Sequence, residues 1–530
     1  MHKDTSAAVI VLNGSDRSQA ARRGQMPCFC TAWLLLLCAC LAAGLTSPAM
    51  AAEQDLPNVI LMTGDDHGWE ETGYNGHPYV RTPVLDEMAS QGLRLNRFYA
   101  AHPSCSPTRG SFLTGRHPNR YGTFAPGWSI RPQEITIAHI LKKAGYHCGH
   151  FGKWHVGPVK AESPTNPGAM GFDEWLSHDN FFELNPHLSR NGGDPQVFEG
   201  ESSAILVDET IKFIGRTREK GKPFCAVVWF GSPHEPFSGL PEDLALYDHL
   251  PEKYPERLVS LTSNETGKPT RRPIGDVLRE RYAEITAMDR AIGTLRDYLA
   301  SSGLRENTIV FYCGDNGTPS CGVLNSPHRG AKATMYQGGI LVPGVLEWPA
   351  RIPSPRTTNV SACTSDLLPT LCSIVGQPLP DRPLDGIDLL PVIDGKLTAR
   401  PEPIFFWSYD TSRLSGAPPS IQPRLQQGTT PLVKLMGGLR TRNFRNVKHP
   451  EISDDDYRGP RAVVDERYKL VVHETRQGEV KRELFNVATD RAEKHNIIKH
   501  FPNIAKRLEK QLRTWQDSVL NSVRGGDYRD

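Results

Sequence analysis

The amino-acid sequence predicts an α/β fold, in which a large mixed, mostly parallel sheet is flanked by helices and followed by a smaller C-terminal α+β subdomain with an antiparallel sheet. Short apolar runs alternate with amphipathic segments from residue 58 onward, which is typical of a parallel sheet covered by helices. After about residue 460 apolar and polar residues alternate instead, as in an antiparallel sheet with one solvated face. With 530 residues the chain can bury a large core.

The first 52 residues have the pattern of a leader that directs export. Arg22 and Arg23 precede an apolar run over residues 33–43, and small residues at 49–51 form a cleavage site. A membrane anchor is the alternative, and residues 37–40 resemble a lipoprotein box, which leaves lipid anchoring open. No later stretch is long enough to cross a membrane. We expect an exported protein, periplasmic or secreted from a bacterium, with a eukaryotic secretory or lysosomal route as the alternative.

Residues 53–400 are expected to form the catalytic domain. Apolar runs predict strands over residues 58–63, 224–230 and 309–313. Helices are predicted where a capping residue or a proline opens a periodic run and a glycine ends it. The predicted helices run from Thr82-Pro83 to Gly92, from a Ser106 cap and Pro107 to Gly115, from 135 to 144, and from 279 to 302.

Residues 401–530 are expected to form the C-terminal subdomain. Arg400-Pro401-Glu402-Pro403 marks the boundary, and a stretch rich in Pro, Arg and Gly follows it. The segments 462–464, 468–472 and 483–486 predict a small antiparallel sheet. An amphipathic pattern over residues 503–519 predicts a closing helix.

Composition excludes some classes of function. The formal net charge is +2 and 23% of the residues are charged, so the chain lacks the positive excess of a nucleic-acid-binding protein. Outside the leader and Cys105, six cysteines remain, and in an exported chain they can form disulfides whose pairing the sequence does not predict. No Cys-x-x-Cys pair follows the leader, which argues against a zinc ribbon or a thioredoxin-type site.

Polar side chains follow the predicted strands at the points where the strands end. In open parallel sheets, ligands bind at the carboxyl ends of the strands, so we expect these side chains to share one edge. Carboxylate and amide oxygens suit a hard cation, and adjacent carboxylates repel one another unless a cation neutralises them. The strand-end residues are Asp65, Asp66, Lys153, His155, His234, Asp315 and Asn316.

Positive charge and a helix N-terminus accompany these carboxylates. Arg109, Lys153 and Lys332 supply cations, and the helix that begins near Cys105 offers free N–H groups to an anion. Together they predict a pocket for a tetrahedral oxyanion ester. A cysteine-phosphatase loop is excluded because its arginine would stand at Ser111. A buried structural cysteine before an ordinary helix is the alternative for Cys105.

The stretch Cys105-x-Pro107-x-Arg109, followed by Leu113-Thr114-Gly115-Arg116, resembles the signature of the type I sulfatases of the alkaline phosphatase superfamily. The resemblance extends from about residue 58 to the C-terminal helix. Companion motifs occur in the family order, namely Asp65-Asp66, Gly152-Lys153-Trp154-His155, Ser232-Pro233-His234, Gly314-Asp315-Asn316-Gly317, Lys332, Thr364 to Thr370, and Asp385-Gly386-Ile387-Asp388.

The resemblance implies an arylsulfatase-like hydrolase whose nucleophile is made after translation. A formylglycine-generating enzyme would oxidise Cys105 to Cα-formylglycine, whose hydrate attacks the sulfur of a sulfated carbohydrate or aryl sulfate. His155 would then take a proton so that sulfate leaves. Arg109 and Lys153 would hold the formylglycine, and Lys332 and His234 would hold the sulfate. One Ca²⁺ would be bound by residues matching Asp65, Asp66, Asp315, Asn316 and the modified Cys105.

Two other functions remain open from the sequence. A phosphodiester or phosphonate monoester hydrolase of the same superfamily would use a similar site. A catalytically inactive exported carbohydrate-binding protein is the non-enzyme alternative, although every expected catalytic position is filled. His67, His178 and Asn180 are candidate substrate-binding residues, with a solvent-exposed loop position as the alternative for each.

Overall fold

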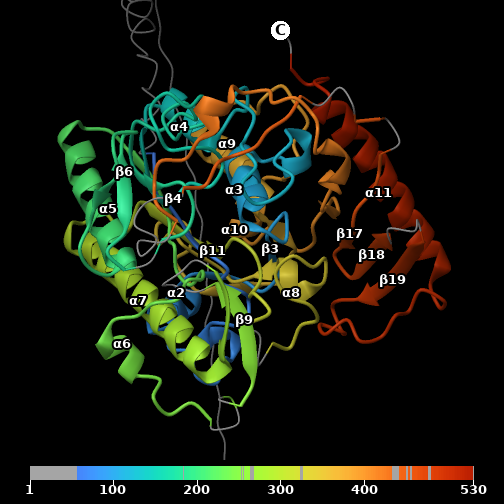
Figure 1. The fold of residues 1–530 in the computed structure, drawn as a ribbon, viewed down its shortest axis with the longest axis horizontal. Helices are drawn as coiled ribbons and strands as arrows, with labels where there is room; N and C mark the ends of the chain where they lie inside the picture. The colour runs from blue at the N-terminus through green and yellow to red at the C-terminus, as the bar shows by residue number, and fades with distance from the viewer. Residues whose placement is uncertain are drawn as a thin grey trace, which may run out of the picture. The chain divides into compact units, whose positions relative to one another are not determined.

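A ten-stranded mixed sheet with a parallel centre lies at the middle of the fold, as the sequence predicts (Figure 1). The computed structural model describes residues 56–528 except 183, 252–253, 255, 263–267, 323–325, 433–440, 449–451, 454–455 and 475–478. The predicted leader lies outside the described residues. The strand order is β14 (Arg356–Thr358), β2 (Leu93–Leu95), β13 (Gly344–Glu347), β11 (Thr308–Gly314), β1 (Asn58–Gly64), β8 (Phe224–Trp229), β4 (His147–Lys153), β5 (Glu174–His178), β6 (His187–Arg190) and β7 (Gln196–Val197).

Helices cover both faces of this sheet, which explains why its central strands are apolar on both sides. In β1, Ile60 and Met62 pack with one helical layer, whereas Val59 and Leu61 pack with the other. The first layer contains α2 (Pro83–Gln91), α5 (Ser202–Glu219) and α7 (Ile274–Ser301). The second contains α3 (Cys105–Thr114), α4 (Ile137–Lys143), α9 (Leu367–Val375) and α10 (Leu390–Ile393).

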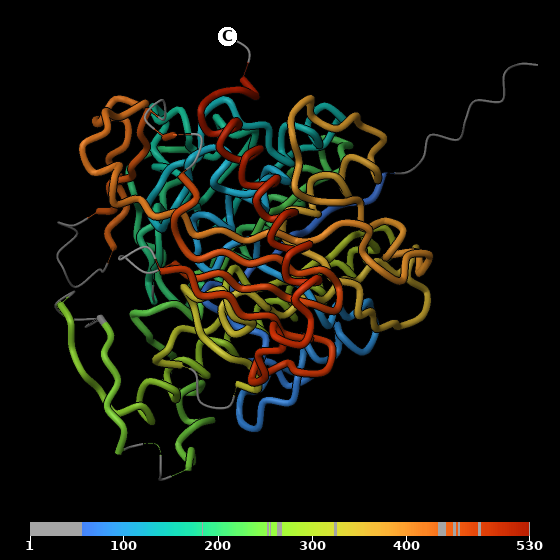
Figure 2. The backbone as a smooth tube through the Cα atoms, turned by 90° about the vertical axis from the view of Figure 1, so that its right-hand side faces the viewer, coloured from blue at the N-terminus to red at the C-terminus, as the bar shows by residue number. Residues whose placement is uncertain are grey.

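A four-stranded antiparallel sheet near the C-terminus confirms the second part of the predicted fold. Its order is β16 (Ile404–Trp407), β17 (Arg461–Asp465), β18 (Tyr468–Glu474) and β19 (Val480–Asn486). The closing helix α11 (Pro502–Val523) lies across these strands, on the side that faces the viewer in Figure 2. Val464, Val471 and Phe485 of this sheet share a buried cluster with Tyr99 and Met335. The division at residue 400 stays a prediction.

Smaller elements connect the two sheets or lie at the periphery. A three-stranded sheet joins β12 (Leu341–Val342), β3 (Phe98–Tyr99) and β15 (Ala362–Cys363), and β9 (Leu258–Thr262) pairs with β10 (Pro269–Pro273). The remaining short helices are α6 (Pro241–Ala245), α8 (Gln337–Ile340), and the 3-10 turns η1 (Gly73–Asn75), η2 (Pro118–Arg120), η3 (Thr364–Asp366), η4 (Thr411–Leu414) and η5 (Pro423–Gln426).

Several predicted boundaries were wrong. Helix α3 begins at Cys105 rather than after a Ser106 cap, because the Ser106 hydroxyl accepts a hydrogen bond from the Gly127 N–H instead. Gly115 ends the helix in the left-handed conformation, as predicted. Helix α7 begins five residues earlier than predicted, after Pro273, and α11 continues to Val523. Strand β16 was not predicted.

The seven described cysteines are all buried, and all are free thiols. No disulfide therefore links the six that the sequence left available for pairing. Among the described residues, no helix is both long and apolar enough to cross a membrane.

Asp385 ties the N-terminal and C-terminal parts of the described chain together. Its carboxylate accepts bonds from Arg120 Nε at 2.7 Å, from Trp515 Nε1 of α11 at 2.7 Å, and from the His117 N–H at 2.6 Å. Burial alone would raise the pKa of Asp385, but the charge and hydrogen bonds of Arg120, with smaller contributions from His117, lower it well below its usual value.

We expect Asp385→Asn to destabilise the protein by about 3 kcal/mol at pH 7, because it leaves the buried Arg120 without its charge partner. A carboxylate with a lowered folded-state pKa contributes stability above the unfolded pKa, and this contribution is lost as pH falls toward the folded value. The stability difference from the wild type should therefore shrink below about pH 4. Chemical unfolding at several pH values measures it, and a difference that is constant with pH would contradict the assignment.

Candidate active site

Four neighbouring parallel strands deliver the predicted site residues to one edge of the sheet. Strands β1, β8 and β11 run in the same direction, and β4 runs parallel to β8. Two backbone bonds join the loops beyond the strands, from the Asp65 N–H to the Ser232 carbonyl at 2.9 Å and from the Asp315 N–H to the Gly64 carbonyl at 3.1 Å. The predicted strand-end residues Asp65, Asp66, Lys153, His155, His234, Asp315 and Asn316 follow these strand ends or, for Lys153, form the last residue of one.

Cys105 begins α3 beside these carboxylates. Its Sγ lies 3.8 Å from Asp66 Oδ1, and one potential ligand atom from each of Asp65, Asp66, Cys105 and His234 lies within 4.8 Å of the others. Asp66 also accepts from Asn316 Nδ2 at 2.8 Å, and its N–H donates to Asp315 Oδ1 at 2.9 Å. Three of the five predicted metal ligands, Asp65, Asp66 and Cys105, therefore share this cluster with His234. The other two, Asp315 and Asn316, adjoin it through their hydrogen bonds with Asp66.

Arg109 connects α3 to the ends of β11 and β4. Its guanidinium donates to Asp315 Oδ2 at 2.8 and 3.1 Å and to the Lys153 carbonyl at 3.0 Å, and its side chain is 1% exposed. Lys153 Nζ lies 2.5 Å from Asp65 Oδ2 and is fully buried. Because both side chains are buried, neither Arg109 nor Lys153 is accessible to a large ligand.

Lys332 reaches the same cluster from a loop after β11. The Lys332 N–H donates to the Thr318 carbonyl at 2.9 Å, and its Nζ lies 2.6 Å from Asp66 Oδ1. Gly317 and Gly338 allow this loop to approach, because a Cβ on Gly317 would lie 1.9 Å from the Gly338 carbonyl oxygen. Unlike Arg109 and Lys153, the Lys332 side chain is 21% exposed, so it faces the opening of the site.

The two predicted catalytic histidines differ in their surroundings. His234 Nε2 lies 3.7 Å from Asp66 Oδ2 and 3.4 Å from Lys332 Nζ, and its ring stacks on Phe181. His155 is buried, has a left-handed backbone with φ of 58°, and neither of its ring nitrogens has a hydrogen-bond partner among the described residues. Burial, reinforced by Lys153 and Arg442, lowers the pKa of His155 well below its usual value, which keeps the ring neutral.

The buried carboxylates strongly affect one another. Burial raises the pKa of Asp315 to about 7, and the Asp65 carboxylate adds to this effect in spite of Arg109. Burial also acts to raise the pKa of Asp65, but Lys153, His234 and Arg109 lower it well below its usual value. The cluster therefore needs positive charge to keep its carboxylates ionised together.

A divalent cation fits the residues of this cluster. Asp65 Oδ1 and Asn316 Oδ1 are buried oxygens without a hydrogen-bond partner among the described residues. Three carboxylates and an amide oxygen form the hard, oxygen-rich donor set that Ca²⁺ or Mg²⁺ prefers. The Cys105 thiol is a weaker match, because burial raises its pKa far above the usual value and disfavours the thiolate that binds metals.

Arg281 is a supporting residue that sequence reasoning missed. It lies in α7, is fully buried, and forms a bidentate ion pair with Glu71 at 2.6 Å. Its guanidinium also donates to the carbonyls of Asp66 and Pro233, which belong to two of the site loops. Arg281 therefore positions both loops. No local signal marks it, because its partners lie 48 to 215 residues away in the chain.

Arg442 is a second missed residue and approaches from the C-terminal part of the chain. A Cβ on Gly127 would lie 3.2 Å from its Nη1, and the Gly127 N–H donates to Ser106, the neighbour of Cys105. Among the described residues its Nε has no hydrogen-bond partner. Arg442 is one arginine of many in a stretch without a motif, so the sequence alone could not identify it.

The three candidate substrate-binding residues are buried. His67 bonds to the Tyr312 hydroxyl at 2.5 Å and to the Glu71 carbonyl at 2.7 Å, so it supports the Asp65-Asp66 loop from behind. His178 bonds to the Pro431 carbonyl at 2.8 Å. Asn180 is 1% exposed, and neither of its side-chain polar atoms has a partner among the described residues. None of the three is a solvent-exposed loop residue.

Comparison with known proteins gives consistent matches. The model of the Sulfatase family matches residues 57–377. N-acetylgalactosamine-6-sulfatase of Canis lupus familiaris is 32% identical over 421 residues, covering 72% of this chain and 73% of its own, and arylsulfatase A of Homo sapiens is 32% identical over 375 residues, covering 66% and 70%. The crystal structure of Ps i-CgsB in complex with k-i-k-neocarrahexaose aligns with a TM-score of 0.68 at 21% identity, covering 89% of this chain and 94% of that one.

We expect Arg281→Met to destabilise the protein by about 3–5 kcal/mol, because it leaves the buried Glu71 carboxylate without its charge partner. Arg279→Gln is a matched control on the same helix, since Arg279 pairs with Asp248 on the surface and its loss should cost at most about 1 kcal/mol. Denaturant unfolding measures both changes. Equal effects of the two substitutions would contradict the role assigned to Arg281.

Proposed function

The chain belongs to the sulfatase family, and we propose that it hydrolyses sulfate monoesters of a sulfated carbohydrate with a formylglycine made from Cys105 and one bound Ca²⁺. The observation that carries this proposal is the position of Cys105 at the start of α3, 3.8 Å from Asp66 and within a cluster of buried carboxylates and cations. The proposed nucleophile must lie beside the metal-binding carboxylates, and Cys105 occupies that position.

The charges of the site support a divalent cation together with an anionic substrate. Asp65, Asp66 and Asp315 oppose Arg109, Lys153 and Lys332, so the charges of these side chains cancel when all are ionised. A Ca²⁺ held by Asp65, Asp66, Asp315 and Asn316 would make the pocket positive, and it would stabilise negative charge that develops on a substrate oxygen. A sulfate monoester carries the negative charge that such a pocket attracts.

The Cys105 thiol itself is a poor nucleophile in this position. Burial raises the pKa of this thiol in spite of the nearby cations Lys153 and Lys332, so little thiolate forms near neutral pH. Formylglycine would supply an aldehyde hydrate instead. One hydrate oxygen would displace the alcohol from the sulfur of the ester, and return of the hydrate carbon to the aldehyde would then release sulfate. Conversion of Cys105 would require a formylglycine-generating enzyme as a partner during maturation.

Exposure separates the cations into two groups. Arg109 and Lys153 are buried and hold Asp315 and Asp65, so they would orient the nucleophile. Lys332 and His234 have side chains that are 21% and 12% exposed, so they are the groups that a sulfate could contact, and one of them would protonate the leaving alcohol. His155 is neutral and has free ring nitrogens among the described residues, which suits a general base.

A sulfated sugar is the substrate class that the similar proteins favour. One relative is named for the 6-sulfate of N-acetylgalactosamine, and one structural neighbour was solved in complex with k-i-k-neocarrahexaose. Arg442 lies beside the site, and its Nε has no hydrogen-bond partner among the described residues, so it would add affinity for a second anionic group of such a substrate. Residues 1–52 support export to a periplasm or the exterior, with a secretory or lysosomal route as the alternative.

We expect the Cys105 peptide, from protein made with a formylglycine-generating enzyme, to have lost sulfur and gained oxygen in its mass spectrum. Cys105→Ala should lower the turnover of p-nitrophenyl sulfate by at least about 10⁴-fold, because the nucleophile is absent. Cys372→Ala is the control, since this buried cysteine lies in α9 and outside the site.

Full sulfatase activity of Cys105→Ala would refute the assignment of the nucleophile. Parallel assays with p-nitrophenyl phosphate and a phosphonate monoester test the other hydrolase activity. Faster turnover of either ester than of the sulfate would favour that activity, and absence of all turnover in protein with confirmed formylglycine would favour a carbohydrate-binding role.

Removal and return of calcium tests the metal site. Protein at a Ca²⁺ concentration about 100-fold above Kd should gain about 2.7 kcal/mol of stability over chelated protein, which raises Tm. Asp315→Asn should abolish most of this gain, whereas Asp208→Asn, which removes an exposed carboxylate of α5, should leave it unchanged. Differential scanning calorimetry measures the shift. A Ca²⁺ response that survives in Asp315→Asn would exclude this carboxylate as a ligand.

A further inference from the structure

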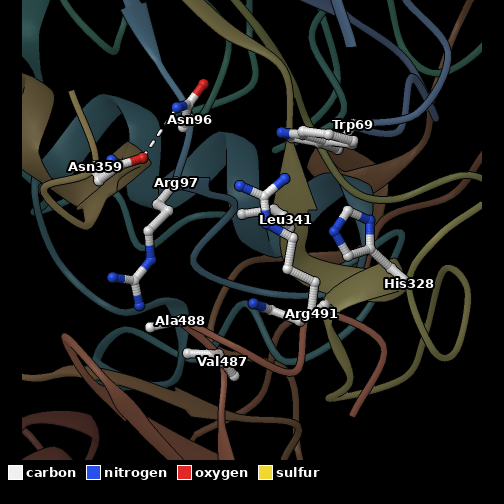
Figure 3. A pocket seen from close by; sticks show the side chains of 10 residues that line it. Trp69, Asn96, Arg97, His328, Leu341, Asn359, Val487, Ala488 and Arg491 are labelled. Atoms are coloured by element: carbon white, nitrogen blue, oxygen red, sulfur yellow. Dashed lines mark hydrogen bonds between the residues drawn. The ribbon is translucent and has the colours of Figure 1, made fainter. Parts of the chain in front are cut away.

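A second pocket lies between the Trp69 loop and the C-terminal sheet. It has a volume of about 180 Å³, whereas a single water needs about 10–15 Å³, so it can hold a ligand of several heavy atoms. Its floor is buried and includes Trp69, His328 and Gln337. None of the predicted catalytic or metal-binding residues lines it. Figure 3 shows Trp69 above the pocket, with His328 and Arg491 on one side and Arg97 on the other.

Buried polar atoms around this pocket have no partners among the described residues. They comprise both ring nitrogens of His328, Gln337 Oε1, Asn96 Oδ1 and Arg97 Nε. His328 is 7% exposed, and its ring meets Trp69 edge to face at 4.8 Å. Burial, with a contribution from Arg491, lowers the pKa of His328 to about 4, so the neutral ring offers one donor and one acceptor. Unsatisfied buried polar groups are costly, so a cluster of them around one cavity indicates a polar ligand or ordered water.

The pocket also carries positive charge. Arg491 forms no ion pair with any described carboxylate, and its guanidinium lies 5.9 Å from the Trp69 ring. Arg97 is only partly neutralised, since its Nη1 lies 3.4 Å from Glu466 Oε2. In Figure 3 the Arg491 side chain extends toward Trp69, across the middle of the pocket. A ligand there would contact the Arg491 guanidinium, the Arg97 guanidinium that is shared with Glu466, and the Trp69 ring.

We propose that this pocket binds one anionic sugar residue, at a site separate from the catalytic centre. Arg491 and Arg97 would contact its sulfate or carboxylate, and His328, Gln337 and Asn96 would bond to hydroxyl groups. The Trp69 indole would pack against apolar C–H groups of the sugar, as aromatic side chains do in mixed polar and apolar sites. The choice of a sugar as the occupant rests on the proposed function, whereas the anion-binding chemistry rests on the pocket alone.

Such a site would hold a second residue of a sulfated polymer or a second molecule of a small sulfated sugar. It would give a role to Trp69, which follows Asp65 and Asp66 closely in the chain and lines this pocket. It would also explain why Arg491 forms no ion pair with any carboxylate in the described part of the chain.

Calorimetric titration of full-length Cys105→Ala protein with galactose 6-sulfate tests the proposal, because this background binds without turnover. We expect two binding events, and we expect Arg491→Gln to weaken one of them at least about tenfold while leaving the other unchanged. Arg413→Gln is the matched control, an exposed arginine that does not line the pocket. Arg491 is itself exposed, so its substitution should not prevent folding.

Two further probes distinguish the recognised group. Glucuronate binding that depends on Arg491 would support an anion site that also accepts carboxylates. Binding of uncharged galactose to the same site with equal affinity would overturn the proposal. Retention of both events in Arg491→Gln would also overturn it. The proposed function can fail independently of this proposal. In that case the wild type would not hydrolyse sulfate esters, although the Arg491-dependent binding would still be observed.

Discussion

Three buried carboxylates at the ends of neighbouring strands dictate where the surrounding positive charges must lie. Asp65, Asp66 and Asp315 cannot all be ionised in one buried space unless cations surround them. Arg109, Lys153 and Lys332 come from a helix, a strand and a loop, and each pairs with at least one of these carboxylates. The left-handed conformation of Asp66, with φ of 63°, is a local strain that this network holds in place.

Further buried contacts hold the loops of the site in position. Arg281 joins Glu71, the Asp66 carbonyl and the Pro233 carbonyl, so one side chain of α7 restrains both the metal-site loop and the His234 loop. His67 supports the same loop through Tyr312. Because these groups lack solvent, the loss of one partner leaves the other unpaired, which couples the stability of the fold to the geometry of the site.

Local sequence patterns predicted the central strands and the placement of polar residues at their ends, because both follow from short-range rules. The same rules misplaced the start of α3, since the Ser106 hydroxyl bonds to Gly127 rather than capping its own helix. They also missed β16, which is an edge strand of the C-terminal sheet and pairs with β17 more than 50 residues later in the chain. Arg281 and Arg442 were missed because their contacts lie far away in the chain.

Local sequence patterns were enough to predict the fold class, the family signature around Cys105, and the identity of the residues that meet at the sheet edge. These properties are encoded in periodicity and in the side chains that end each strand. The three-dimensional arrangement was needed to show which cations are buried and which face the opening. It was also needed to show that His67 supports rather than lines the site, and that Trp69, His328 and Arg491 surround a second pocket. Those outcomes depend on burial and on distances between remote segments, which no local pattern contains.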